Sequence, residues 1–229
     1  NYVDEYDPDV QKQFAAMTYR LSLDTYLVVF RGTDDTLIGW KEDFHMTYMD
    51  HVPAQRRAAS YLQHVMKEFP KGRFLVAGHS KGGNLAAYAS SYLPDSLFER
   101  VDVIYSYDAP GLNKAIIETE GYQRTSPYIR RFVPQGSIVG MMLEVPEPTT
   151  IVKSRAFGGF AQHDAFTWEI KDYSFVTVSE TSPDSQQTDL TLKQWVRETS
   201  AEERKEFFDT FFGIFLDAGI TSINDLKNL

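Results

Sequence analysis

The segment Phe74-Leu-Val-Ala-Gly-His-Ser-Lys-Gly-Gly83 decides the fold of this chain. It begins as a short apolar strand and ends in the small residues of a helix expected from Gly82 to about Leu93. Between the two, the pattern Gly-x-Ser-x-Gly around Ser80 is typical of a sharp strand-to-helix turn, where larger neighbours would clash. Such a turn presents the Ser80 hydroxyl at the carboxyl edge of a sheet. Ser80 is therefore the candidate nucleophile, and a glycine-rich turn with an accidental serine is the alternative.

Strands and helices alternate around this segment, as judged from β-branched runs and from apolar residues at helical spacing. The alternation predicts an α/β fold of three layers, with a mostly parallel central sheet and helices on both faces, in one domain over residues 1–229. Residues 134–160 are irregular and rich in Pro and Gly, and are a candidate lid or pocket segment. A polar linker or exposed loop is expected at 179–188, before a C-terminal helical segment at 189–229. The expected strands are 14–20, 25–31, 74–77, 101–107, 129–133 and 173–178, and the expected helices are 54–69, 82–93, 112–119 and 201–217.

Composition narrows the function classes. The formal net charge is −9 and no run of Lys and Arg occurs, so no nucleic-acid partner is expected. The absence of cysteine excludes disulfides, thiolate metal sites and a cysteine nucleophile. No apolar stretch approaches the ~18 residues that a membrane span needs, and the acidic start at residues 1–7 does not resemble a signal peptide. We expect a cytoplasmic protein, and a removed leader is also compatible with this sequence.

A nucleophilic serine needs a base, and histidine is the usual one. The chain has five histidines, and four of them precede or adjoin Ser80. In hydrolases built on this kind of turn the chain order is serine, acid, histidine, which leaves His163 as the base. A surface histidine is the alternative for His163. His79 adjoins Ser80 but is expected to point away from it and to pack beneath the turn.

The acid that orients the histidine is expected at the carboxyl end of a strand, where active sites of open α/β sheets form. Asp108 lies just beyond the predicted strand 101–107 and is followed by Ala-Pro-Gly. The alternative role for Asp108 is to cap the helix that follows. Glu144 is the second candidate for the acid, and Asp164 is too close to His163 in sequence to be the first choice.

The helix that begins near Lys81 directs its backbone N–H groups, and the positive end of its dipole, toward the same edge. The Lys81 N–H is therefore a candidate oxyanion donor, and one such donor is worth about 3 kcal/mol in a transition state.

Several motifs occur together: Phe30-Arg-Gly-Thr33 with Trp40 and Asp43, the Ser80 turn, and His163 five residues before Trp168. This set resembles the bacterial α/β-hydrolases related to class 3 lipases. The runs Tyr107-Asp-Ala-Pro-Gly111 and Val133-Pro-Gln-Gly-Ser-Ile-Val-Gly140 resemble more closely a largely uncharacterised bacterial branch of that group. The resemblance covers about residues 14–175 and implies the α/β-hydrolase fold.

The resemblance also bears on two site residues. It implies that Thr33 supplies the second oxyanion donor through its backbone N–H, with its hydroxyl nearby; a plain turn at 31–33 is the alternative. Class 3 lipases place the acid just before a Val-Pro pair, whereas here Phe132 precedes Val133-Pro134. This departure favours Asp108 as the acid or leaves the triad incomplete.

Together these residues predict a serine hydrolase that cleaves a carboxylic ester, lipase-like or esterase-like, through an acyl-enzyme. The expected partner is a small-molecule ester or lipid-like substrate, with no metal and no organic cofactor. Thioesterase, amidase or acyltransferase chemistry on the same triad is the first alternative, and a catalytically degenerate binding domain is the second. Phe208, Phe211, Phe212 and Phe215 form a stripe on the last helix, for which core packing is favoured over a pocket wall.

Overall fold

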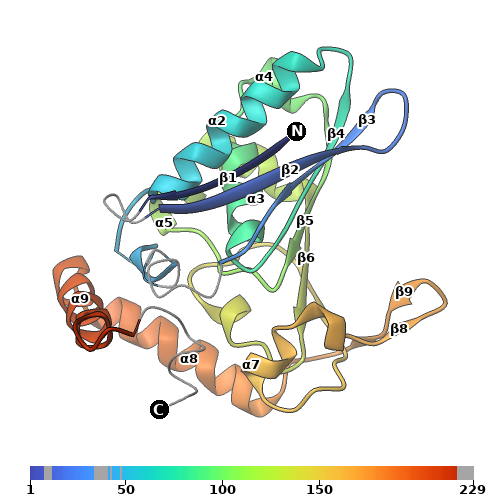
Figure 1. Cartoon of the computed structure of the whole chain (residues 1–229). Coiled ribbons are helices and arrows are strands. Elements are labelled where there is room, and N and C mark those ends of the chain that lie inside the picture. Colours follow the sequence, from blue (N-terminus) through green and yellow to red (C-terminus); the bar gives the residue numbers. More distant parts are fainter. Residues whose placement is uncertain (8–11, 34–40, 42, 47, 221–229) are drawn as a thin grey trace.

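A central sheet organises the computed structural model, which describes residues 1–7, 12–33, 41, 43–46 and 48–220 (Figure 1). Within these residues eight strands form one sheet in the order β1-β2-β3-β4-β5-β6-β7-β10, and β8 pairs with β9 in a separate hairpin. Neighbouring strands from β3 to β7 are parallel, whereas β1, β2 and β10 pair in the antiparallel sense. The strands are β1 (Tyr2–Asp7), β2 (Lys12–Arg20), β3 (Thr25–Phe30), β4 (Arg73–His79), β5 (Val101–Tyr107), β6 (Ile129–Pro134), β7 (Thr149–Val152), β8 (Ile170–Lys171), β9 (Ser174–Phe175) and β10 (Thr177–Val178).

The parallel register brings three strand ends to one edge of the sheet. Phe30 at the end of β3 pairs with Gly78 of β4, and His79 at the end of β4 pairs with Tyr107 at the end of β5. The residues that follow these strands therefore meet at the carboxyl edge, which is where ligands bind in open α/β sheets.

One face of the sheet carries the main core. The side chains at alternate positions of β3 and β4 are buried there, among them Tyr26, Val28, Phe74 and Val76. They pack against α2 and α3, and every residue of α3 is buried. Small residues make this close packing possible, because a helix rich in Gly, Ala and Ser can approach the strands and α2 together. The helices are α2 (Pro53–Glu68), α3 (Lys81–Ser91), α4 (Asp95–Phe98), α5 (Lys114–Ile117), α6 (Glu120–Thr125), α7 (Gly159–Gln162), α8 (Pro183–Glu198) and α9 (Ala201–Asp217), with short 3-10 turns η1 (Ser126–Tyr128), η2 (Val139–Met141) and η3 (Ala165–Thr167).

The other face is contacted near its carboxyl end by the segment that contains α7 and η3. The ring of Trp168, just after η3, lies 6.3 Å from the ring of Tyr107 on β5. Phe175 lies 5.6 Å from Phe132 on β6 and 5.5 Å from Trp168. Helical segments thus occupy both sides of a mostly parallel sheet, which is the α/β-hydrolase fold that the sequence predicts.

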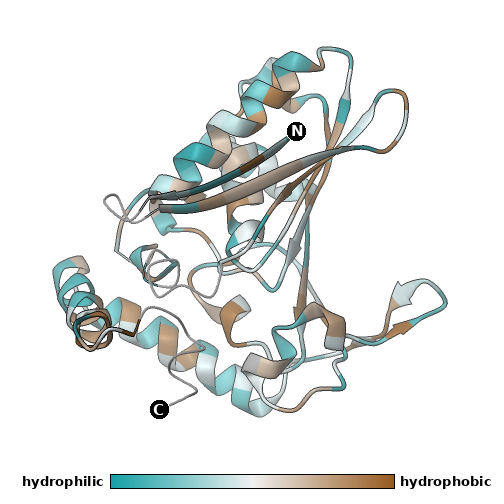
Figure 2. Ribbon diagram, in the orientation of Figure 1, coloured by the Kyte–Doolittle hydropathy of each residue, from teal (hydrophilic) through white to brown (hydrophobic). Residues whose placement is uncertain are grey.

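A second, smaller apolar cluster lies below the carboxyl edge, where α8 and α9 pack together (Figure 1). Phe208 and Phe212 are its buried centre, with Phe44, Trp195 and Phe215 packed against them. In Figure 2 the central strands show brown segments among paler ones, and α9 carries both teal and brown residues, as expected for an amphipathic helix. The prediction of core packing is therefore confirmed for Phe208 and Phe212, whereas Phe211 is exposed.

Several local predictions are wrong. Residues 149–152 are not irregular: they form β7, a strand of the main sheet, so this part of the 134–160 segment is no lid. The polar stretch 179–188 is not all linker, because α8 begins at Pro183 after a capping serine. The helix expected at 112–119 is shorter, because α5 covers only Lys114–Ile117 and Thr119 then caps a new helix, α6. The strand expected at 173–178 is broken between β9 and β10.

Candidate active site

Ser80 occupies the turn between β4 and α3 with φ 56° and ψ −133°. This left-handed backbone costs on the order of 1–3 kcal/mol for a non-glycine residue and persists only where the surroundings hold it. The Ser80 N–H donates to the Tyr107 carbonyl at 2.9 Å, and the Gly83 N–H donates to the Ser80 carbonyl at 3.0 Å. A Cβ on Gly78 would lie 2.1 Å from the Gly82 carbonyl group, so the turn closes only with glycine there. Ser80 is 8% exposed.

Asp108 and His163 form the closest pairing of an acid and a base at this edge. Asp108 follows β5, is fully buried and has φ 43°, while His163 caps the carboxyl end of α7. The Nδ1 atom of His163 lies 2.6 Å from Oδ2 of Asp108. The carboxylate can only accept, so Nδ1 carries the proton and Nε2 is left as the basic nitrogen. Glu144, the second candidate acid, is exposed and pairs through its backbone with Leu112.

The second oxygen of Asp108 is bound from the segment after β6. Ser137 donates its hydroxyl hydrogen to Oδ1 of Asp108, and the Gly140 N–H donates to the Ser137 Oγ at 3.0 Å. Arg131, buried on β6, donates to the carbonyls of Ala109 and Gly140. Burial lowers the pKa of Arg131 to about 10, although the negative charge of Asp108 acts in the opposite direction. The buried Arg131 guanidinium thus hydrogen-bonds to the loop after β5 and to the loop after β6, the two loops that hold Asp108.

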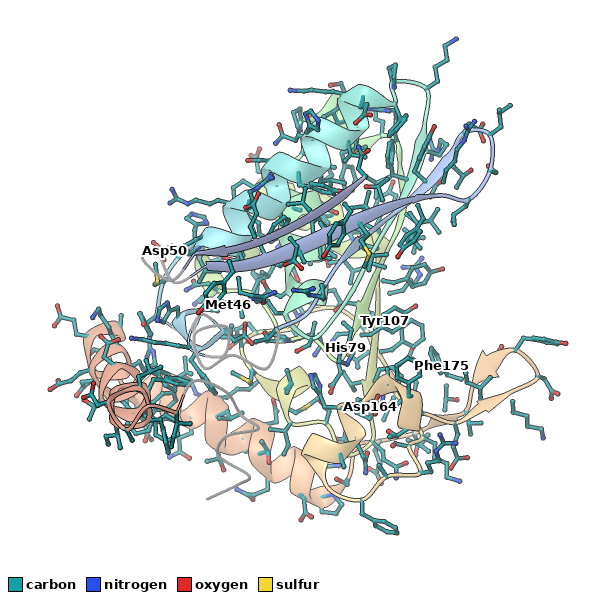
Figure 3. All side chains as sticks on the ribbon, in the orientation of Figure 1. Met46, Asp50, His79, Tyr107, Asp164 and Phe175 are labelled. Carbon is teal, nitrogen blue, oxygen red and sulfur yellow. The ribbon has the colours of Figure 1, made fainter. Side chains whose placement is uncertain are left out.

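His79 supports His163 and does not replace it. Its Nε2 lies 2.7 Å from the His163 carbonyl oxygen, and the two rings are 4.5 Å apart. A carbonyl accepts, so Nε2 of His79 carries a proton. Burial is the main cause that lowers the pKa of His79, with the neighbouring His163 second, and the neutral form is favoured. Figure 3 shows His79 at the carboxyl end of the sheet near Tyr107, above the segment that contains Asp164. Sequence reasoning expected packing beneath the turn and missed this contact with His163.

Thr33 lies on the short segment after β3, against the Ser80 turn. A Cβ on the preceding Gly32 would lie 3.2 Å from the Cβ of Ser80, so the two backbones are in close contact. Thr33 donates its hydroxyl hydrogen to Oδ2 of Asp43, and Oδ1 of Asp43 lies 3.8 Å from Nζ of Lys81. The structure therefore brings Thr33, Ser80 and Lys81 together. Trp40, the other residue of this motif, lies outside the described residues.

The Lys81 side chain is buried, although only its backbone N–H entered the sequence prediction. Its Nζ donates to both the carbonyl and the side-chain Oε1 of Gln13 on β2, each at 2.9 Å. The chain Gln13–Lys81–Asp43–Thr33 thus joins β2, the start of α3 and the segment after β3. Asp43 appeared in the sequence motif without a role, and its spacing from Thr33 was the signal that could have suggested one.

Within the residues that the structure describes, no three His, Cys, Asp or Glu side chains cluster as metal ligands would. Nor is any helix of that part of the chain both long and apolar enough to cross a membrane.

The model of the Mbeg1-like family matches residues 1–213. A comparison with curated protein sequences finds no significant match.

Among solved structures, the lipase of Rhizopus microsporus var. chinensis is 19% identical over 64% of this chain and 59% of its own, with a TM-score of 0.45. The Rhizomucor miehei lipase–propeptide complex is 19% identical over 63% of this chain and 53% of its own, with a TM-score of 0.43. Lipase II from Rhizopus niveus is 18% identical over 70% of this chain and 69% of its own, with a TM-score of 0.45. The chain thus spans little more than half the length of the first two. Likenesses of this size identify no activity.

Proposed function

The chain belongs to the Mbeg1-like family, and we propose that the site at the carboxyl edge of its sheet makes it a serine hydrolase that cleaves carboxylic esters. Ser80 is the nucleophile, His163 the base and Asp108 the acid that orients it. The observation that carries the proposal is the 2.6 Å contact between His163 Nδ1 and the fully buried Asp108, at the strand end next to the one that carries Ser80 in left-handed backbone.

The chemistry follows from the protonation state of His163. With Nδ1–H held by Asp108, Nε2 accepts the Ser80 proton as Oγ attacks the ester carbonyl. The backbone N–H groups of Lys81 and Thr33 stabilise the oxyanion that forms. His163 then gives the proton to the leaving alcohol, which leaves an acyl group on Ser80. Water attacks this acyl-enzyme with His163 again as base, and the carboxylic acid is released.

Two other functions use the same residues. Thioesters, amides or transfer to another acceptor need the same triad, and a panel of ester, thioester and amide substrates with one acyl chain separates them. A catalytically degenerate binding domain is the remaining alternative. The buried Asp108 counts against a degenerate site. It directly follows β5 and provides the acid that is missing before Val133-Pro134, where Phe132 stands.

A fluorophosphonate probe tests the proposal, because it forms a covalent adduct only with an activated serine. We expect labelling of the purified chain, no labelling of Ser80→Ala, and unchanged labelling of Ser60→Ala, whose serine is exposed on α2. Ester turnover is expected to fall by about 10⁶ in Ser80→Ala. If the folded wild-type chain takes no label, or if Ser80→Ala retains it, the proposal is wrong.

A further inference from the structure

A cavity lies between α8, α9 and the segment after η2, and none of its lining residues belongs to the proposed triad. Its volume is about 420 Å³, within the roughly 300–1,000 Å³ of small-molecule sites. With the exception of Thr191, the residues that line it are apolar. Met142 and Leu143 form one wall, Trp195 on α8 another, and Phe207, Phe208 and Phe211 on α9 a third.

The rim of this cavity is incompletely covered. Phe207 is 54% exposed and Phe211 is 45% exposed, whereas Phe208 between them is buried. The rings of Phe207 and Phe211 are stacked 6.1 Å apart. Both rings line the cavity and also reach solvent, so a bound chain would remove apolar surface from water, which is the main driving force for binding such ligands.

A second, basic hollow of about 220 Å³ adjoins the apolar cavity, and the two share Leu143, Leu192 and Val196 as lining residues. Four cationic side chains and one carboxylate line it: Lys114, Lys193, Arg197, Arg204 and Glu144. This grouping stands out in a chain with a net charge of −9.

The four cationic side chains differ in the ion pairs and hydrogen bonds that they form within the protein. Lys193 pairs with Asp189 at 2.8 Å and Lys114 with Glu118 at 3.7 Å, whereas Arg204 donates to the Val196 carbonyl at 2.8 Å. Arg197 is exposed, one residue after Val196, which lines both hollows. A group bound beside Arg197 would therefore lie where the apolar and basic linings meet.

We propose that the two hollows form one binding site for a single-chain amphiphile with an anionic head group. The apolar chain lies among Trp195, Phe207 and Phe211, and the head group lies against Arg197 and Lys193. The head group is a carboxylate or a phosphate, since both bind guanidinium and ammonium groups by charge-assisted hydrogen bonds. This site needs neither Ser80 nor hydrolysis, so it stands apart from the proposed function.

Trp195 provides the test, because a brominated chain quenches a tryptophan only at close range. The Ser80→Ala chain is titrated, below the micelle concentration, with dodecanoate, dodecyl phosphate and the neutral dodecanol, and then with brominated dodecanoate. We expect saturable binding of one or both anions, weaker binding of dodecanol, and quenching that disappears in Trp195→Phe. The preferred anion distinguishes a carboxylate from a phosphate head group.

Matched charge variants test the head-group half of the site. Arg197→Gln is expected to raise the Kd of the anion roughly tenfold, because one charge-assisted contact is lost, and to leave dodecanol binding unchanged. Lys205→Gln on α9 removes the same charge from an exposed residue outside both linings and is expected to change neither. The proposal would be overturned by no saturable binding of either anion, by no quenching with brominated dodecanoate where dodecanoate itself binds, by equal affinity for dodecanol, or by equal effects of the two variants.

Discussion

The Ser80 turn and the pair of helices α8 and α9 differ in what holds them in place. The turn is fixed through backbone groups: the Ser80 N–H bonds to the end of β5, and residues 78 and 82 touch backbone with no room for a Cβ. The two helices are held mainly through side chains, by the cluster around Phe208 and Phe212 and by Lys41, which pairs with Asp209 at 2.8 Å.

This difference matches what each region is proposed to do. A strained serine keeps its geometry only where the strands on both sides leave it no alternative. Two helices joined by side-chain packing can leave a space between them, and the cavity beside Trp195 is that space. Substitutions at the first region should therefore alter chemistry sharply, while those at the second should alter stability by smaller amounts.

Among variants that keep Ser80, the largest expected effect is that of Asp108→Asn. The amide preserves the shape but can donate to His163 Nδ1, which favours the wrong tautomer of the imidazole. Turnover is expected to fall by about 10⁴ while the circular dichroism spectrum and the Tm stay close to wild type. Steady-state kinetics on an activated ester measure the change.

Glu144→Gln is the matched control, since Glu144 is the other candidate acid and is exposed in the hollow next to α8. Its turnover should remain that of the wild type. A large loss in Glu144→Gln together with near-normal rates in Asp108→Asn would reassign the acid.

The next effect compares two ion pairs, one in each region. Asp43→Asn removes the carboxylate whose Oδ1 lies 3.8 Å from Nζ of the buried Lys81. Removing one partner of a buried ion pair lowers the free energy of unfolding by about 3 kcal/mol. Asp189→Asn breaks a shorter pair, 2.8 Å, on the surface of α8, where such pairs contribute at most about 1 kcal/mol. Urea unfolding followed by circular dichroism measures both losses.

Turnover separates the two variants further. Asp43 accepts from the Thr33 hydroxyl, so Asp43→Asn is expected to lower kcat roughly tenfold to a hundredfold by displacing the oxyanion segment. Asp189→Asn should leave kcat unchanged. Equal unfolding free energies for the two variants would show that the Lys81–Asp43 pair does not hold the turn.

The same contrast explains what could be predicted from the sequence. Ser80, Asp108 and Thr33 each follow a strand, and local patterns reveal strand ends and a strand-to-helix turn. His163 was found by elimination among five histidines. The supports of these residues, such as Ser137 and Arg131, could not be found in this way, because their partners come from other strands and depend on tertiary packing.

The missed elements have local causes. The polar residues at the start of α8 predict a linker. However, Ser182 followed by Pro183 is a helix-start signal, and the Ser182 hydroxyl oxygen caps α8 by accepting from the Ser185 N–H. β7 has only four residues, and β1 contains three acidic residues at the edge of the sheet, so neither forms the continuous apolar run that marks a buried strand.

The last expected effect concerns pH and His45, which faces Lys41 and, from α9, Asp209 and Lys205. Burial, with Lys41 second, lowers the pKa of His45 from 6.5 to about 4. Between these values the unfolded chain binds a proton that the folded chain does not. The contribution of neutral His45 to the free energy of unfolding is therefore fully present above pH 6.5. It is lost as the pH falls toward 4, by up to about 3 kcal/mol. His79, whose pKa is also lowered, acts with the same sign and remains in every variant.

His45→Gln should remove this part of the pH dependence, and His64→Gln, whose histidine is exposed on α2, should not. Unfolding free energies from urea titrations at several pH values between 4 and 7 give the slopes for the two variants and the wild type. A flatter slope in His45→Gln would mean that protonation of His45, which is buried beside Lys41 and α9, contributes to acid unfolding. Identical slopes in all three chains would show that His45 has the same pKa in the folded and unfolded states. His45 would then have no part in acid unfolding.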